Sequence, residues 1–318
     1  MGVVLCLAVA LVVSVNQSGP AAARGQAPGR KIYVADSGND SITEYAARAK
    51  GNVSPTRTVR GSNTGLKGPE GLAVDSSGTI YVANAGNNTI TEYAAKANGN
   101  ASPTRTIRGS KTGLSSPDGL AVDSSGTVYV ANFGGAGVTE YASRANGDIA
   151  PVRTISGAKT TLRSPWGVGV SPSGTLYVTN HSGGQIVEYA SRANGDVAPV
   201  RTISGRRTLL YEGWGITFDA SGTAYISNGS SINNAVTEYS PGAHGNVSPD
   251  NSIRGRKTGI SAPNGEAFDS SGTLYVCNNG IPNSVTAYAS GATGNASPHR
   301  IISGVSTRLH GCSGLAVH

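Results

Sequence analysis

Short apolar runs, rich in β-branched and aromatic residues, recur along most of the chain and are separated by polar turn residues. In the stretch of residues 71–94 these runs are residues 72–74, 80–83 and 90–93, and residues 104–107 form a fourth. Asp, Ser, Gly and Asn fill the gaps between the runs, which is typical of strands joined by turns. The pattern predicts a unit of four antiparallel strands.

The same unit repeats six times, and the tyrosine of its second run marks the period. Successive copies of this tyrosine are 48, 48, 48, 48 and 50 residues apart, at Tyr33, Tyr81, Tyr129, Tyr177, Tyr225 and Tyr275. A period of this length, made of short β-rich runs, is typical of a propeller blade. The pattern starts at residue 31 with a second strand, and residues 314–318 supply a first strand with no second strand after it. We therefore predict an all-β, six-bladed β-propeller over residues 31–318, closed by three N-terminal strands and one C-terminal inner strand.

Residues 1–23 stand apart from the repeats. An apolar run over residues 3–15 is followed by residues 20–23, which are Pro-Ala-Ala-Ala. This order predicts a secretory signal peptide cleaved near Ala23, although no Lys or Arg precedes the apolar run. A mis-assigned start codon or a disordered tail is the alternative. Because the run is too short to span a bilayer, we expect a secreted or periplasmic monomer with no membrane span and a short linker over residues 24–30.

Charge changes this picture little. The chain has 25 Lys and Arg against 18 Asp and Glu, a net charge of +7. Arginines recur on the fourth strands and glutamates on the third, which predicts solvated cross-strand ion pairs. We expect no nucleic-acid partner, because no aromatic residues interleave the arginines. The arginines are Arg57, Arg105, Arg153 and Arg201, and the glutamates are Glu44, Glu92, Glu140, Glu188 and Glu238.

Cysteine is scarce, and Cys6 falls in the predicted signal. The remaining two, Cys277 and Cys312, do not make a disulfide scaffold. Cys277 ends a second strand, and Cys312 lies in the loop that enters the next blade. A disulfide between them and two separate small hydrophobic side chains both remain open.

The string PEGLAVDSSGTIYVANAGNNTITEY resembles the NHL-repeat class of six-bladed propellers, and the resemblance covers about residues 31–318. More loosely, the architecture and the Pro-X-Gly start of the inner strand resemble the gluconolactonase–regucalcin group and the streptogramin lyases. Propellers of this fold include lactonases, lyases and binding modules. The resemblance therefore implies a fold and leaves the function open.

Strand directions divide the loops between two faces. We call the face that carries the loop into the first strand, and the loop between the second and third strands, the top face. The loops of the opposite, bottom face are nearly uniform among the copies, whereas the top loops differ. The residue before the first-strand glycine is Glu70, Asp118, Trp166, Trp214, Asn264 or Ser313. The residue after the second-strand Asn or Asp is Ser37, Ala85, Phe133, His181, Gly229 or Asn279. This variation predicts a ligand site on the top face.

Three of these positions are possible metal ligands. Glu70, Asp118 and Asn264 offer the oxygen atoms that Ca²⁺ or Mg²⁺ prefers. The resemblance to the gluconolactonase–regucalcin group implies the same, because residues at such inner-strand starts hold the central divalent ion of that group. The alternative is that these side chains are polar caps at a water-filled channel mouth.

Aromatic residues gather at the same predicted mouth. Trp166 and Trp214, both tryptophans of the chain, start inner strands of neighbouring blades. An aromatic shelf beside carboxylates fits a sugar, a lactone or another ring-bearing ligand. The alternative is that the rings plug the channel. The predicted ligand-binding residues are Trp166, Trp214, Phe133, Tyr211 and Asn279.

Glu266 stands where the other copies have Leu72, Leu120, Val168, Ile216 and Leu315. A carboxylate at an apolar position is costly unless it is paired or neutral, and its raised pKa would suit a general acid or base. The alternative is a solvated channel wall. His181 is the histidine that a streptogramin-lyase-like reaction would need. Two hypotheses follow: a binding scaffold for a small molecule, sugar or protein, and a metal-dependent lactonase or other hydrolase or lyase.

Overall fold

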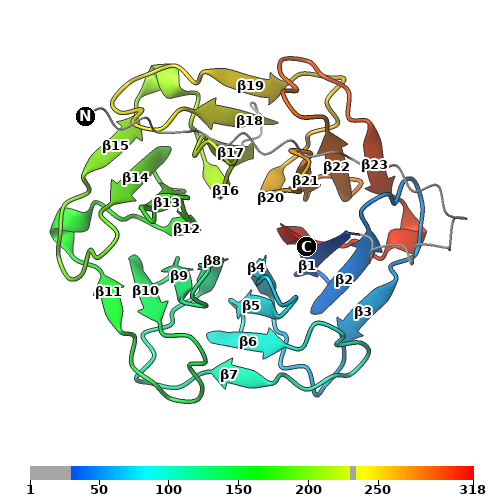
Figure 1. Ribbon diagram of the computed structural model, residues 1–318, viewed down its shortest axis with the longest axis horizontal. Helices are drawn as coiled ribbons and strands as arrows, with labels where there is room; N and C mark the ends of the chain where they lie inside the picture. Colours follow the sequence, from blue (N-terminus) through cyan, green and yellow to red (C-terminus); the bar gives the residue numbers. More distant parts are fainter. Residues whose placement is uncertain (1–29, 230–233) are drawn as a thin grey trace, which may run out of the picture.

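The computed structural model describes residues 30–229 and 234–318 and shows six four-stranded antiparallel sheets arranged in a ring (Figure 1). This confirms the predicted six-bladed β-propeller. The predicted signal peptide (residues 1–23), with Cys6, and residues 24–29 of the predicted linker lie outside the described residues. No helix within the described residues is long and apolar enough to cross a membrane.

Each blade runs from an inner strand beside the central channel to an outer strand at the rim. The inner strands are β4 (Pro69–Val74), β8 (Pro117–Val122), β12 (Pro165–Val170), β16 (Gly213–Phe218), β20 (Pro263–Phe268) and β24 (Cys312–Val317). The second strands are β1 (Lys31–Asp36), β5 (Ile80–Asn84), β9 (Val128–Asn132), β13 (Leu176–Asn180), β17 (Ala224–Gly229) and β21 (Leu274–Asn278).

The outer half of each blade completes the sheet. The third strands are β2 (Ser41–Ala46), β6 (Thr89–Tyr93), β10 (Gly137–Tyr141), β14 (Gln185–Tyr189), β18 (Asn234–Tyr239) and β22 (Ser284–Tyr288). The outer strands are β3 (Arg57–Arg60), β7 (Arg105–Ile107), β11 (Arg153–Ile155), β15 (Arg201–Ser204), β19 (Asn251–Arg254) and β23 (Arg300–Ser303). Three crossovers contain single 3-10 turns, η1 (Ala158–Thr160), η2 (Arg206–Thr208) and η3 (Val305–Thr307).

The ring closes as the sequence predicts. β24 pairs antiparallel with β1, so the last strand becomes the inner strand of the blade that β1, β2 and β3 began. A disulfide between Cys277 and Cys312, with the two Cα atoms 5.6 Å apart, joins β21 to β24 of the next blade. Of the two alternatives that the sequence left open, the structure therefore shows the bonded one. β24 is thus held by backbone pairing within its own blade and by a disulfide to the preceding blade.

The hydrophobic core lies between blades. One cluster combines Val59 of β3 with Leu72 and Val82 of the next blade, and five further clusters repeat this arrangement around the ring. Outside these clusters the backbones of adjacent blades also bond to each other: the Gly99 amide donates to the Thr58 carbonyl at 2.8 Å, and similar parallel bridges recur at each interface. The ring therefore consists of six similar interfaces in place of a single centre.

The predicted cross-strand ion pairs form in four blades. Arg105 Nε, for example, lies 2.8 Å from Glu92 Oε2, and the other pairs are Glu44 with Arg57, Glu140 with Arg153 and Glu188 with Arg201. The prediction that these pairs are solvated is wrong for the glutamates, which are buried at the blade interface beneath the arginines. Glu238 differs from the other four, because Asn251 stands opposite it in β19.

Candidate functional site

The first residues of the six inner strands converge on one cavity at the top mouth of the channel. Its volume is about 90 Å³, and the six variable residues that precede the inner-strand glycines line it. In ring order these are Glu70, Asp118, Trp166, Trp214, Asn264 and Ser313. Asn264, Ser313, Glu70 and Asp118 thus form a polar arc, and the two tryptophans form an aromatic arc facing it. The structure brings Glu70, Asp118, Asn264, Trp166 and Trp214 together around this cavity, whereas Phe133, His181, Tyr211 and Asn279 do not line it.

A β-bulge at the start of the inner strand presents each of these side chains. The register between β4 and β5 shifts between Pro69 and Leu72, so Glu70 and Gly71 occupy the bulge. Bulges re-aim a side chain relative to regular pairing. The glycine is required because inner strands approach closely here: a Cβ at Gly71 would overlap the carbonyl oxygen of Asp118 in the next blade. This explains the glycine of the Pro-X-Gly motif, which all six inner strands keep, whereas the proline is replaced by Gly213 in β16 and by Cys312 in β24.

The two carboxyl groups of the polar arc interact. Asp118 is 5% exposed, and burial, together with the charge of Glu70, raises its pKa to about 8. Burial also raises the pKa of Glu70, while hydrogen bonds from the hydroxyls of Ser313 and Ser37 oppose that rise. These two hydroxyl oxygens are 2.8 Å apart. The arc therefore favours a proton on Asp118, or a cation near its two acids.

Four aromatic rings pack together on the other side of the mouth. The centroids of Trp166 and Trp214 are 4.4 Å apart, Phe133 lies 5.3 Å from Trp166, and His181 lies 4.9 Å from Trp214. We call these four residues the aromatic cluster. Tyr211 is 44% exposed and lies outside the cluster and the cavity lining. Asn279 is exposed and does not line the cavity either.

Glu266 is buried in β20, facing the preceding blade. It is 6% exposed, and its Oε2 accepts a hydrogen bond from the Ser227 hydroxyl of β17. Its Oε1 has no hydrogen-bond partner among the described residues. Burial raises the pKa of Glu266 to about 8. Glu266 thus lines the cavity as a buried, neutral acid at neutral pH, and not as a solvated wall.

Two further buried polar atoms lie in the aromatic cluster. His181 Nδ1 and Trp214 Nε1 have no hydrogen-bond partner in the part of the chain that the structure describes. Orphaned buried donors and acceptors are costly, and a polar ligand group would satisfy them.

Sequence reasoning missed Ser227, and it named Ser37 only as a variable top-loop position without giving it a role. Ser227 stands just before the second-strand Asn, where the other blades have Ala35, Ala83, Ala131, Thr179 and Cys277. Its hydroxyl supports Glu266, and both residues depart from the apolar pattern of their copies. That shared departure in neighbouring blades was the available signal.

The polar arc suits a hard divalent ion in donor type. Glu70, Asp118 and Asn264 supply oxygen atoms, and the coupled acids of the arc would lose their mutual repulsion to a cation. Among the described residues, however, no group of three or more His, Cys, Asp or Glu side chains is arranged to hold a metal. A cation at this mouth would therefore depend on the Asn264 amide and on water.

Comparisons with known proteins agree with the fold. Residues 26–101 and 86–150 match the family described as SMP-30/Gluconolactonase/LRE-like region, which together is less than half of the chain. No curated protein sequence matches the chain. The gluconolactonase side of the sequence resemblance is thus supported over the first blades, and the NHL resemblance stays a prediction.

Similar solved structures extend over most of the ring. A protein of unknown function from Bacteroides caccae has a TM-score of 0.68 at 11% identity, covering 91% of this chain and 98% of its own. A chain of the nidogen/laminin complex has a TM-score of 0.62 at 17% identity, with the same coverage. Virginiamycin B lyase from Staphylococcus aureus has a TM-score of 0.54 at 14% identity, covering 80% of this chain and 75% of its own. At these identities the likenesses show that the chain shares a fold with these proteins, and nothing about its activity.

Proposed function

We propose that this chain is a ligand-binding propeller that takes one end of a small, ring-bearing molecule, such as a sugar or lactone, at the top mouth. The observation that carries the proposal is the division of one cavity into a polar arc and an aromatic arc. Aromatic faces bind the apolar side of a sugar or lactone ring, and the acids and amide bind its hydroxyl or carbonyl groups. The cavity is smaller than the roughly 300–1,000 Å³ of enclosed drug-sized sites, so the rest of the ligand would stay outside.

Tryptophan fluorescence tests the proposal directly, because both tryptophans of the chain lie in the site. We expect D-glucono-1,5-lactone, D-glucose or N-acetylglucosamine to change the emission in a saturable way. Trp166→Ala and Asp118→Ala should each raise the ligand concentration at half-saturation at least about tenfold. This factor corresponds to the loss of one buried polar or stacking contact. Tyr211→Ala serves as the matched control, since it removes an aromatic ring from the same face outside the cavity. An emission that none of the probes changes would count against the proposal.

A metal-dependent hydrolase is the second candidate, favoured by the coupling of Asp118 to Glu70. Glu70, Asp118 and Asn264 would hold Ca²⁺ or Mg²⁺, which would polarise a carbonyl of the substrate. Glu266, protonated at neutral pH, would serve as the general acid, and His181 is the alternative proton carrier of a lyase.

Thermal melts with and without divalent ions decide this candidate. We expect millimolar Ca²⁺ or Mg²⁺ to raise the Tm by binding the folded state only. Glu70→Gln combined with Asp118→Asn should abolish the rise. If the wild-type Tm is the same in calcium, magnesium and chelator, the metal-dependent reaction is ruled out while simple ligand binding stands.

A further inference from the structure

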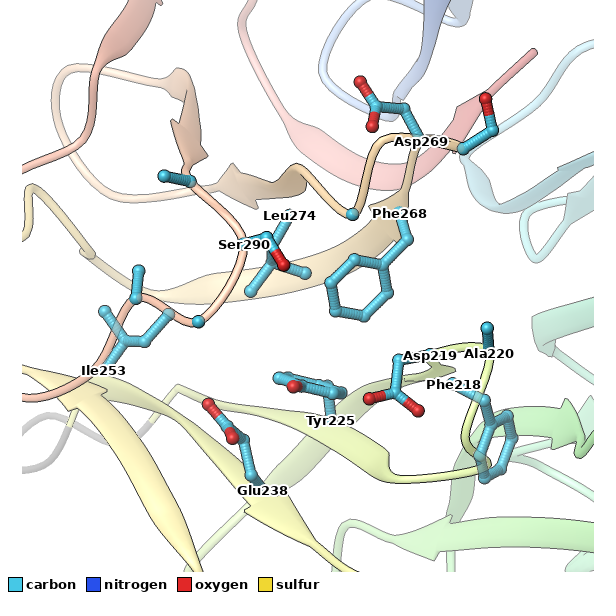
Figure 2. A pocket seen from close by; sticks show the side chains of 15 residues that line it. Phe218, Asp219, Ala220, Tyr225, Glu238, Ile253, Phe268, Asp269, Leu274 and Ser290 are labelled. Carbon is cyan, nitrogen blue, oxygen red and sulfur yellow. The ribbon is translucent and has the colours of Figure 1, made fainter.

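A second cavity opens on the bottom face, far from the top mouth. It has a volume of about 200 Å³ and lies between the blade of β16–β19 and the blade of β20–β23. Figure 2 shows the carboxylates of Glu238 and Asp219, with Tyr225, along one side and Phe268 on the other. The loops at its rim are bottom-face turns, which are otherwise nearly uniform among the six blades.

Comparison with an equivalent interface shows why the space is open. Between the blades of β8–β11 and β12–β15 the corresponding residues leave only about 10 Å³, and Arg153 lines that space beside Glu140. In β19 the arginine position is Asn251, whose side chain is too short to fill it. Glu238 nevertheless remains. The cavity is therefore the place of a missing arginine side chain.

The carboxylate left behind has no cation. Glu238 is 7% exposed, and no Lys, Arg or His pairs with it among the described residues. Burial raises the pKa of Glu238, in contrast to Glu44, whose pKa its pairing with Arg57 and Lys31 lowers. The side chains of Asn251 and Tyr225 hydrogen-bond to Glu238 but bring no positive charge. A buried carboxylate without a counter-ion is costly.

The surroundings add further negative charge and aromatic surface. Asp219 also lines the cavity and pairs with no cation in the described part, whereas Asp269 at the rim has Arg30 at 3.3 Å. Tyr225 hydrogen-bonds to Glu238, as Tyr177 does to Glu188 in a blade that has the arginine. Its ring packs edge-on to Phe268 at 4.7 Å.

We propose that this cavity binds the guanidinium or alkylammonium group of a cationic ligand in the place of the missing arginine. Glu238 would accept its hydrogen bonds, as Glu140 does from Arg153. The rings of Tyr225 and Phe268 line the same cavity, and the face of an aromatic ring attracts a planar cation. About 200 Å³ has room for the head group and a short stem only. The site is independent of the function proposed for the top face.

Agmatine is a suitable probe, since it carries a guanidinium and a primary amine on a short chain. Isothermal titration calorimetry at constant ionic strength should show saturable binding at one site. Asn251→Arg should weaken agmatine binding at least about tenfold, because the new side chain occupies the cavity and pairs with Glu238. The same variant should melt at a higher temperature than the wild type without ligand, so a folding defect will not confuse the result.

Three further variants test the role of the Glu238 charge, control for charge elsewhere and control for the top site. Glu238→Gln should also weaken binding, whereas Asp196→Asn should not. The Oδ1 of Asp196 accepts a hydrogen bond from the Lys159 backbone amide, which an asparagine can also accept. Four other blades already have asparagine at this position: Asn52, Asn100, Asn246 and Asn295. Trp166→Ala should leave agmatine binding unchanged, which separates this site from the proposed top-face function.

A comparison of agmatine with an arginine-containing peptide identifies the source of the cation. If acetyl-Gly-Arg-Gly-amide binds more tightly than agmatine, the ligand is the arginine side chain of a protein; if agmatine binds as tightly or more tightly, the ligand is a free small cation. Both outcomes support the site. The inference is overturned if wild type binds neither probe, or if Asn251→Arg binds agmatine as tightly as wild type does.

Discussion

Glu266 shows how one substitution in a repeat creates a chemically distinct group. At the equivalent position of β4 the chain has Leu72, an ordinary core residue. The carboxyl group of Glu266 enters a similar interface, keeps one hydrogen bond from Ser227, and stays protonated at neutral pH because burial raises its pKa to about 8. A side chain that holds a proton at pH 7 beside a cavity can donate that proton to a ligand.

The same group should make folding stability depend on pH. The unfolded carboxyl ionises near its ordinary pKa of 4.5, whereas the folded one holds its proton until about pH 8. Stability contributed by this group is therefore complete below pH 4.5 and falls as the pH rises to about 8, by about 1.4 kcal/mol for each unit of pKa difference. Asp118 adds a slope of the same sign.

Thermal melts between pH 5 and pH 8 measure this effect. Wild type should lose stability across the range, and Glu266→Leu should lose less. Glu266→Gln retains the shape without the ionisation and should show the same flattened slope. If both variants keep the full wild-type slope, Glu266 does not ionise as we expect.

Each inner strand both supports the ring and presents a side chain to the candidate site. Its bulge presents one side chain to the mouth, and the glycine after it lets neighbouring inner strands touch. β24 has the same role, although its blade is not continuous in sequence: it pairs with β1, which lies at the other end of the repeat region. Cys312 at its start bonds to Cys277 of β21, so the last inner strand is fixed on both sides.

Removing the disulfide should weaken ring closure. The two cysteines are 35 residues apart, and a loop of that length is worth about 3–4 kcal/mol in the chain-entropy description. We expect Cys312→Ser to unfold at lower denaturant concentration than wild type, and reductant to shift wild type toward the variant. The variant itself is the control, because reductant should leave its midpoint unchanged. Equal midpoints for reduced and oxidised wild type would show that the bond adds nothing.

At the scale of the ring, the repeat made most of the architecture predictable. A period marked by Tyr33 and its five copies sets the blade number, and an unpaired strand at each end of the pattern implies the closure. Strand direction alone places Glu70 and Asp118 on one face, because each begins an inner strand. The variable positions before the inner-strand glycines also line one cavity, whereas those after the second-strand Asn or Asp do not.

What the sequence could not supply depends on burial and on contacts between blades. The ionisation of Glu266 depends on the depth of the interface, and its partner Ser227 lies in another blade. Tyr211 looked adjacent to the tryptophans but lies on an exposed turn. The sequence does show that Glu238, unlike the other four glutamates, has no arginine at the corresponding fourth-strand position, where Asn251 stands. The cavity beside Glu238 could not be predicted, because it depends on how Phe268 and Tyr225 of two neighbouring blades pack.

Ring closure by β24 also sets a problem of timing during synthesis. Roughly 280 residues separate β1 from β24, so at about 5–20 residues per second the inner edge of β1 waits roughly 15–55 s on the ribosome for its partner. β4 emerges much earlier and contains the same Gly-Leu-Ala-Val as β24. We expect nascent chains to mispair β1 with β4, detectable by limited proteolysis of ribosome-stalled chains, until the late-arriving β24 displaces it and Cys312 locks the exchange.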